Sequence, residues 1–373
     1  MSKSLDQIIR PAVREAEGYQ PSEPVERIAS RIGKQVHELI RLDLNENPYG
    51  TSFRVQEALA SFDNYHRYPD ADQTNARRRL AKYASIASEQ IVSVAPERII
   101  LSNGADEAID MLMMATIDPG DEVIIPEPTF GVYRERPPLF GGVARIVPRS
   151  ADFGLDVEAI ERAITPKTKL MFITSPNNPT GNLPTHHQIV RLLHTGIPMV
   201  LDEAYYEFCG KTYLPLSAEF DNMIVMRTLS KWAGLAGMRL GYTIFPLEFA
   251  QEMWKVKQPF NVSAAGLLAI DAVLDDQDYL LHTVARIRVE RSRLFRQLRK
   301  LNFLQPFPSQ GNFILCQVTR GDAHDIHRRL GEQGIIIRKY FDPMLRDYLR
   351  ISVGKPEDTD ALMSALLAMA PEI

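Results

Sequence analysis

The segment Thr228-Leu-Ser-Lys-Trp-Ala-Gly-Leu-Ala-Gly-Met-Arg-Leu-Gly-Tyr242 places a single lysine, Lys231, close to hydroxyl side chains and ahead of a second cation, Arg239. The hydroxyls belong to Thr228 and Ser230, and the three glycines of the segment permit close approach of the backbone. Hydroxyls and a guanidinium can hold a phosphate while the amine forms a Schiff base with an aldehyde. The segment therefore predicts a pyridoxal phosphate site with Lys231 as its nucleophile.

Short apolar runs alternate with helical patterns around this segment. The runs expected to form strands are residues 98–102, 122–126, 144–147, 169–174, 199–202, 223–227 and 240–245. Helical patterns separate the earlier runs, over 76–85 and 106–116 and around residues 135, 160 and 190. The alternation predicts an α/β fold, a three-layer αβα domain with a mostly parallel sheet, whose ligands lie at the carboxyl ends of its strands.

The pattern changes near residue 260. One long helix is expected over about 263–301, followed by short strands at 312–318, 335–338 and 349–353. Residues 261–373 are therefore expected to form a smaller α+β domain, and residues 46–260 the large domain. Residues 1–45 are expected to form an N-terminal arm that joins the small domain or a dimer contact.

Composition limits the kinds of partner. The chain of 373 residues has a formal net charge of −4, so it has no overall positive potential that would attract nucleic acid. Its two cysteines, Cys209 and Cys316, lie far apart, so a reducing compartment is expected. The N-terminus has no apolar signal core, and no apolar run approaches the roughly 20 residues that span a bilayer. We therefore expect a cytoplasmic protein without membrane or nucleic-acid partners.

Further candidates lie at the ends of two predicted strands. Asp202 ends an apolar run, and a carboxylate beside a pyridinium nitrogen would keep that nitrogen protonated. Tyr205 could hydrogen-bond the 3′-oxygen of the ring, and the proline-rich loop 175–181 could present Asn178 to the same oxygen. Taken alone, Asp202 could equally cap a helix, and the loop could be an ordinary turn. The lysine downstream favours the cofactor interpretation.

The start of a predicted helix and a nearby aromatic pair offer two more contacts. Backbone N–H groups of Gly104, Ala105 and Asp106 could hold a phosphate, although the same residues could simply begin a helix. Either Tyr133 or Phe130 could stack on a pyridine ring, although aromatic residues near a helix start more often belong to the core.

Arginines in the last third of the chain are candidates for anion binding. Arg338 ends one predicted strand and Arg350 begins another, and a guanidinium binds carboxylate or phosphate through two parallel hydrogen bonds. An ion pair within the protein is the alternative for both. Three histidines on one predicted helix lack the spacing of a metal site, so no metal is expected; they are His186, His187 and His194.

Together these segments resemble the fold-type I pyridoxal-phosphate aminotransferases, and within them the histidinol-phosphate aminotransferase family. The similar segments run in order over nearly the whole chain. They are residues 44–50, 67–70, 175–181, 202–208, 228–242, 261–263, 309–315, 334–338 and 349–354.

The resemblance implies a role for each candidate. Lys231 would carry the Schiff base, and the cofactor would be held by Gly104, Ala105, Asp106, Tyr133, Asn178, Asp202, Tyr205, Thr228, Ser230 and Arg239. It also implies a homodimer in which Tyr68 of one subunit reaches the cofactor phosphate of the other. Contacts with the substrates would come from Tyr19, Asn47, Arg338 and Arg350.

The implied reaction is transamination between L-histidinol phosphate and 2-oxoglutarate, which gives imidazole acetol phosphate and glutamate in histidine biosynthesis. Three departures from the family pattern are residues 19–22 (Tyr-Gln-Pro-Ser), residues 104–107 (Gly-Ala-Asp-Glu) and Trp232. The first bears on the recognition of a phosphorylated substrate. Alternatives on the same fold are an aromatic amino acid aminotransferase, a threonine-phosphate decarboxylase and a binding protein without catalytic activity.

Overall fold

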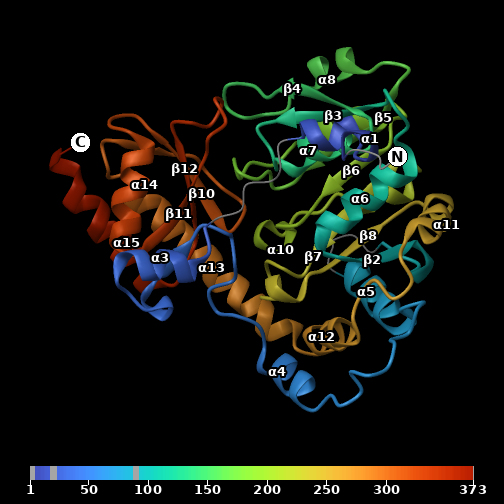
Figure 1. The fold of residues 1–373 in the computed structure, drawn as a ribbon, viewed down its shortest axis with the longest axis horizontal. Helices are drawn as coiled ribbons and strands as arrows, with labels where there is room; N and C mark the ends of the chain where they lie inside the picture. Colours follow the sequence, from blue (N-terminus) through green and yellow to red (C-terminus); the bar gives the residue numbers. More distant parts are fainter. Residues whose placement is uncertain (1–4, 17–22, 87–91, 373) are drawn as a thin grey trace.

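A seven-stranded sheet forms the centre of the larger part of the molecule in this computed structural model, which describes residues 5–16, 23–86 and 92–372 (Figure 1). The strand order is β2-β8-β7-β6-β5-β3-β4. Neighbouring strands are parallel except around β8, which is antiparallel to both β2 and β7. The strands are β2 (Ile99–Asn103), β3 (Glu122–Glu127), β4 (Val143–Pro148), β5 (Thr168–Thr174), β6 (Met199–Asp202), β7 (Met223–Thr228) and β8 (Leu240–Ile244).

Helices cover both faces of this sheet because alternate residues of its strands point to opposite sides. One face packs under α6 (Gly104–Thr116), α7 (Val132–Leu139) and α11 (Leu247–Val256). The other face packs under α5 (Thr74–Ile86), α8 (Val157–Ala163), α9 (His186–Leu193) and α12 (Ala264–Asp275). The predicted three-layer α/β fold with a mostly parallel sheet is confirmed.

A five-stranded sheet, with the order β1-β11-β12-β10-β9, forms the smaller part. The strands β11, β12, β10 and β9 are antiparallel to one another in sequence of pairing, whereas β1 runs parallel to β11. Its strands are β1 (Ile40–Leu42), β9 (Leu304–Pro306), β10 (Phe313–Val318), β11 (Ile335–Lys339) and β12 (Tyr348–Ser352). The accompanying helices are α3 (Val25–Ile32), α13 (Gln277–Leu298), α14 (Ala323–Glu332) and α15 (Pro356–Met369).

The N-terminal segment reaches both parts of the molecule. Its strand β1 and helix α3 lie with the C-terminal elements in Figure 1, in agreement with the pairing of β1 and β11. The short helices α1 (Leu5–Ile8) and α2 (Pro11–Glu15) lie near α7, where the Arg10 side chain donates to the carbonyl of Leu139. We propose to keep the expected domain boundaries at residues 45 and 260, with β1 as the strand that the arm adds to the small domain.

The long helix expected over 263–301 is instead two helices. Helix α12 ends at Asp275 and α13 begins at Gln277. Between them Asp276 has φ −120° and ψ 28°, outside the α-helical region, and it serves both as the C-cap of α12 and the N-cap of α13. Three carboxylates within four positions, 275–278, disfavour an uninterrupted helix there because aspartate is a poor helix former.

The remaining helices connect these elements. Helix α4 (Phe53–Ala60) packs against α12, and the single-turn helix α10 (Tyr206–Cys209) packs against α13. Within the ranges that the structure describes, no helix combines the length and apolar character needed to cross a membrane.

Candidate active site

A cavity of about 1080 Å³ lies between the carboxyl ends of β6 and β7 and the five-stranded sheet. It extends from the N-terminus of α6 to the loop after β11. Most of the candidates from the sequence meet here. Those on its wall are Ala105, Asp106, Asn178, Asp202, Tyr205, Thr228, Ser230, Lys231, Arg239, Arg338 and Arg350.

Lys231 lies at the centre of this wall, in the loop after β7. It is half-buried, and its Nζ donates to the carbonyl oxygen of Leu44 at 3.0 Å. Burial, followed by the positive charge of Arg350, lowers the pKa of Lys231 to about 8. A substantial fraction of the amine is therefore neutral near neutral pH, which a nucleophile or a proton acceptor requires.

Close backbone packing forms an anion-binding corner at the start of α6. A Cβ on Gly104 would lie 2.6 Å from Nη2 of Arg239, and a Cβ on Gly241 would lie 2.8 Å from the carbonyl carbon of Gly104. Arg239 donates to Asp106 at 2.9 Å, and the N-cap of α6 makes no side-chain hydrogen bond to its first turn. The first turn of α6 thus lacks a side-chain cap from Asn103, so its backbone N–H groups can donate to an anion beside the Arg239 guanidinium.

The hydroxyls predicted beside the lysine occupy the same corner. Thr228 Oγ1 and Ser230 Oγ are 2.9 Å apart, and the Ser230 backbone N–H donates to Thr228 Oγ1 at 3.1 Å. Both side chains are buried and both line the cavity. The corner therefore offers hydroxyl, guanidinium and backbone donors, which is the donor set of a phosphate site.

Asp202 provides a buried carboxylate at the end of β6. It accepts hydrogen bonds from the Tyr133 hydroxyl and, at 2.8 Å, from the Ala204 backbone N–H. Burial raises the pKa of Asp202 to about 6, although both hydrogen bonds act in the opposite direction. A cationic N–H placed in the cavity beside it would favour the ionised carboxylate and lower this pKa.

Asn45 and Asn178 form hydrogen bonds with two other residues of the cavity wall, Tyr205 and Arg350. Asn45 donates to the Tyr205 hydroxyl oxygen at 3.0 Å, which leaves the tyrosine proton to donate elsewhere. Asn178 Oδ1 accepts from Arg350 at 2.7 Å, which leaves its amide N–H₂ as a donor. Burial raises the pKa of Tyr205 to about 12, so the phenol keeps its proton.

Two arginines face each other on neighbouring strands. Arg338 of β11 and Arg350 of β12 are directly paired in the antiparallel register, and both line the cavity. Arg350 also donates to the Asp43 carbonyl at 2.5 Å, while its Nε is buried with no hydrogen-bond partner among the described residues. Two guanidiniums that are paired across neighbouring strands and line one cavity can bind an anionic ligand between them.

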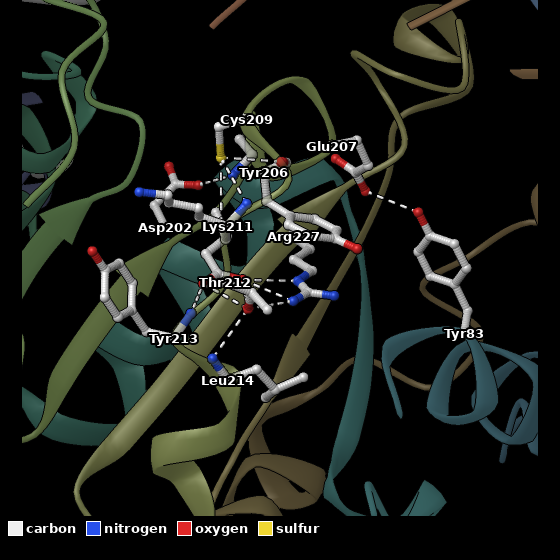
Figure 2. A network of polar contacts seen from close by, with 12 residues as sticks. Tyr83, Asp202, Tyr206, Glu207, Cys209, Lys211, Thr212, Tyr213, Leu214 and Arg227 are labelled. Atoms are coloured by element: carbon white, nitrogen blue, oxygen red, sulfur yellow. Dashed lines mark hydrogen bonds and ion pairs between the residues drawn. The ribbon is translucent and has the colours of Figure 1, made fainter. Parts of the chain in front are cut away.

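A buried network of charged and polar side chains lies at the ends of β6 and β7, outside the cavity lining (Figure 2). Glu203 follows Asp202, and Arg227 precedes Thr228, and their side chains form an ion pair at 2.8 Å with at most 1% exposure. Thr212 donates to the same carboxylate at 2.7 Å and accepts from Arg227. Because side chains alternate along a strand, this pair fixes the relative position of β6 and β7 while Asp202 and Thr228 line the cavity.

Tyr133 does not line the cavity, contrary to its expected stacking role. Its ring is fully buried and stacks on Phe172 at 4.5 Å between ring centroids. Phe130, the other candidate from the sequence, lies on the cavity wall instead. The reason is helix phase: Tyr133 is the second residue of α7 and points into the core, whereas Phe130 precedes the helix. We therefore propose Phe130, rather than Tyr133, as the residue that would stack on a pyridine ring.

Asn47 also lies away from the cavity. It is buried and donates to the Trp232 carbonyl at 2.9 Å and to Thr283 at 3.3 Å, so its contacts are structural. Asn45 lines the cavity in its place, with a left-handed φ of 54° that asparagine tolerates. Both asparagines belong to one short motif, and nothing in that motif distinguishes between them.

The residues that line the cavity leave the expected roles of Tyr68 and Tyr19 untested. Tyr68 is 82% exposed and stacks on Phe260 at 4.5 Å between ring centroids, outside the cavity lining. Its expected contact with a second subunit remains a prediction. Tyr19 lies outside the described residues.

The cavity fits pyridoxal 5′-phosphate. The corner at α6 supplies donors for a phosphate, and Asp202 supplies a carboxylate for a ring nitrogen. The amine of Lys231 lies between them, with its pKa lowered to about 8. The Arg350 guanidinium, which also lines the cavity, could bind a second anion.

Comparison with known proteins agrees with this geometry. Residues 37–366 match the family described as aminotransferase class I and II. A histidinol-phosphate aminotransferase of Dehalococcoides mccartyi strain ATCC BAA-2266 / KCTC 15142 / 195 is 44% identical over 338 residues, which are 91% of this chain and 92% of that protein. Histidinol-phosphate aminotransferase 1, chloroplastic, of Arabidopsis thaliana is 40% identical over 97% of this chain and 85% of that protein.

A solved structure extends the agreement to the fold. The histidinol-phosphate aminotransferase of Sinorhizobium meliloti, crystallised in complex with pyridoxal 5′-phosphate, superposes with a TM-score of 0.85 at 26% identity. The match covers 98% of each chain, so it includes both sheets and the cavity between them. The family match and these similarities lead to one conclusion: the chain belongs to the class I and II aminotransferases.

Proposed function

We propose that this protein uses pyridoxal 5′-phosphate to transfer the amino group of L-histidinol phosphate to 2-oxoglutarate. One observation carries the proposal: the Lys231 amine and the facing Arg338 and Arg350 guanidiniums line the same cavity. An amine poised for reaction thus shares its cavity with two groups that bind anions. The names of the similar proteins support the choice of amino donor.

Different residues of the chain transfer the proton and orient the cofactor. Bound pyridoxal 5′-phosphate supplies the aldehyde that exchanges with the amino group and the ring that withdraws electrons from the substrate carbon. Lys231 would act as the base that takes a proton from the substrate carbon and as the acid that returns it, since its amine lines the cavity and its pKa is lowered to about 8. Asp202 would keep a ring nitrogen protonated, and the hydroxyl of Tyr205 and the amide of Asn178 would donate hydrogen bonds that orient the cofactor.

The arginines distinguish the two substrates. Arg350 binds the α-carboxylate of 2-oxoglutarate, a group that histidinol phosphate lacks. Arg338 binds the phosphate of histidinol phosphate, since a guanidinium matches a phosphate through paired hydrogen bonds. Arg338 and Arg350 are neighbours in the sheet, so a molecule with anions at two positions can reach both.

Two finer features complete the proposal. We propose a homodimer, supported by the exposed ring pair of Tyr68 and Phe260, which a monomer leaves largely in water. We also propose that the protein acts in the cytoplasm, supported by the two unpaired thiols of Cys209 and Cys316, which suit a reducing compartment.

The test is the half-reaction of the purified holo-protein with single amino donors, followed by the cofactor absorbance. Histidinol phosphate should react with the highest kcat/KM, ahead of phenylalanine and phosphothreonine. Arg338→Ala should raise KM for histidinol phosphate about 10- to 100-fold and leave phenylalanine almost unchanged. The exposed Arg320→Ala serves as the matched control.

Other outcomes would support the rival functions. Faster reaction with phenylalanine would indicate an aromatic amino acid aminotransferase. Release of carbon dioxide from phosphothreonine would indicate a decarboxylase. An equal effect of Arg338→Ala on phosphorylated and unphosphorylated donors would refute the proposed phosphate contact.

A further inference from the structure

Arg149, directly after β4, is a partly buried cation, and its hydrogen bonds to other described residues reach only neutral oxygens. Its Nε donates to the Pro126 carbonyl at 3.3 Å, Nη1 to the Phe153 carbonyl at 3.2 Å and Nη2 to Asn177 Oδ1 at 3.1 Å. Burial lowers the pKa of Arg149 to about 10, and no carboxylate of the described residues pairs with it. Because desolvation of a charge without a carboxylate partner costs free energy, stability alone does not account for this arginine.

Asn177 accepts a hydrogen bond from Arg149, and its side chain is fully buried. All of the hydrogen-bonding positions of its amide are occupied. Its Nδ2 donates to the Pro128 carbonyl at 3.0 Å and to Thr180 Oγ1 at 2.7 Å. Its Oδ1 accepts from Thr129 Oγ1 at 2.8 Å and from Arg149. A side-chain amide can donate two hydrogen bonds and accept two in this way, so all four positions are occupied and only one orientation of the amide satisfies them.

Asn177 joins two walls of the cavity without being part of either. The loop 128–130, which carries Phe130, lines one wall, and Asn178 with Pro179 lines the other. Asn178 in turn accepts from Arg350 at 2.7 Å. The position of one buried amide therefore sets the aromatic wall, the Asn178 amide and one anion-binding arginine relative to each other.

We propose that Arg149 is a positioning residue for the cofactor pocket and acts through the Asn177 amide. The guanidinium fixes the orientation of Asn177, and Asn177 holds the loops 128–130 and 178–179 at the separation that binds pyridoxal phosphate. This inference rests on the proposed function, because it concerns the same cavity. It assigns a role at the site to a residue that touches neither cofactor nor substrate.

The first test compares cofactor affinity with stability in Arg149→Met. Methionine fills the apolar path of the arginine stem but removes the charge and the contact with Asn177. The dissociation constant of pyridoxal phosphate, measured on the apo-protein by fluorescence, should rise about tenfold or more, because small displacements of positioning groups weaken the fit. The Tm of the apo-protein should stay within a few degrees of the wild type. A merely structural arginine would lower Tm and leave the affinity of the folded fraction unchanged.

Arg145→Met is the matched control on the same strand. Arg145 lies on β4, has a side chain that is 45% exposed, and pairs with the buried Glu122 away from the cavity lining. Its loss should change neither the cofactor dissociation constant nor the Tm of the apo-protein to a comparable extent. Arg149→Lys, which keeps the charge without the three-way fork, should restore only part of the affinity.

A double-mutant cycle with Asn177→Ala decides whether the arginine acts through the amide. If it does, the double variant binds pyridoxal phosphate no more weakly than Asn177→Ala alone. Additive losses, or wild-type affinity in Arg149→Met, would overturn the inference. Should Arg149→Met fail to fold, Arg149→Lys and the same cycle built on it provide the measurement. Wild-type protein that takes up no pyridoxal phosphate would instead refute the proposed function, so the two failures are distinguishable.

Discussion

The sheet side of the cavity (Asp202, Thr228 and Lys231) is built from neighbouring strand ends, whereas the arginine side joins segments from opposite ends of the chain. On the arginine side the hydrogen bond between Ser352 and Asn45 spans 307 positions, and Arg350 reaches back to the Asp43 carbonyl. Backbone register therefore fixes the first set of groups, and side-chain contacts between distant segments fix the second. Changes on the sheet side should consequently affect every reaction, and changes on the arginine side should depend on the substrate.

The largest expected effect comes from the sheet side. Lys231→Ala removes the amine that is placed to accept and return the proton, so transamination should fall by at least about 10⁴-fold with every donor. The absorbance of the covalently bound cofactor should disappear together with the activity. Lys255→Ala, on the surface of α11 and paired with Glu252, serves as the control and should keep full activity. Retained transamination in Lys231→Ala would contradict the assignment of the nucleophile.

On the arginine side the expected effect is smaller and selective. Arg350→Ala should lower kcat/KM for 2-oxoglutarate about 10²- to 10³-fold, because a truncated charge contact in a buried site costs about 2–5 kcal/mol. Arg350→Lys should recover little, because an ammonium cannot reproduce the contacts with Asn178 and Asp43. Steady-state kinetics with both substrates provides the measurement. A loss of the same size for histidinol phosphate would remove the distinction between the two sides.

How much the sequence can predict also differs between the two sides. Asp202 and Thr228 end apolar runs, so strand periodicity alone is enough to place them at the ligand edge of the sheet. The seven strands of the large sheet lie within a few residues of their expected positions. Local patterns are sufficient there because each strand is a buried, continuous apolar segment.

The arginine side depends on contacts that no local pattern encodes. The strands β1 and β9 were not predicted, since each has only three residues and forms only against a distant partner. The choice of Asn45 over Asn47 depends on a left-handed φ that appears only when the segment docks on β12. No sequence pattern singles out Arg149 either, because its role follows from burial among neutral acceptors.

The pKa of Lys231, on the sheet side, depends on the charge of Arg350, on the arginine side. The pH dependence of cofactor uptake therefore tests whether the two sides interact. Burial and the charge of Arg350 lower this pKa to about 8, so the neutral, reactive amine increases through that pH. The rate of cofactor uptake by the apo-protein should rise about tenfold between pH 7 and 9 and then level off. An unperturbed lysine would show a rate still rising above pH 10. Arg350→Met should move the plateau to higher pH, and an unchanged profile would show that the arginine side does not influence the lysine.

The smallest expected effect concerns the aromatic pair near the start of α7, of which Phe130 lines the cavity and Tyr133 does not. Phe130→Leu should weaken cofactor binding only about two- to tenfold, since an aromatic stacking contact contributes about 0.5–1.5 kcal/mol. The Tm of the apo-protein should change little because Phe130 is only partly buried at the cavity surface. Tyr133→Phe, which keeps the ring in the core but removes its hydrogen bond to Asp202, is the paired variant and should leave the stacking contribution intact. If Phe130→Leu bound the cofactor as tightly as the wild type, the ring would be held without an aromatic partner from α7 or the loop before it. Cofactor binding by the sheet side would then depend on charged groups and hydroxyls alone.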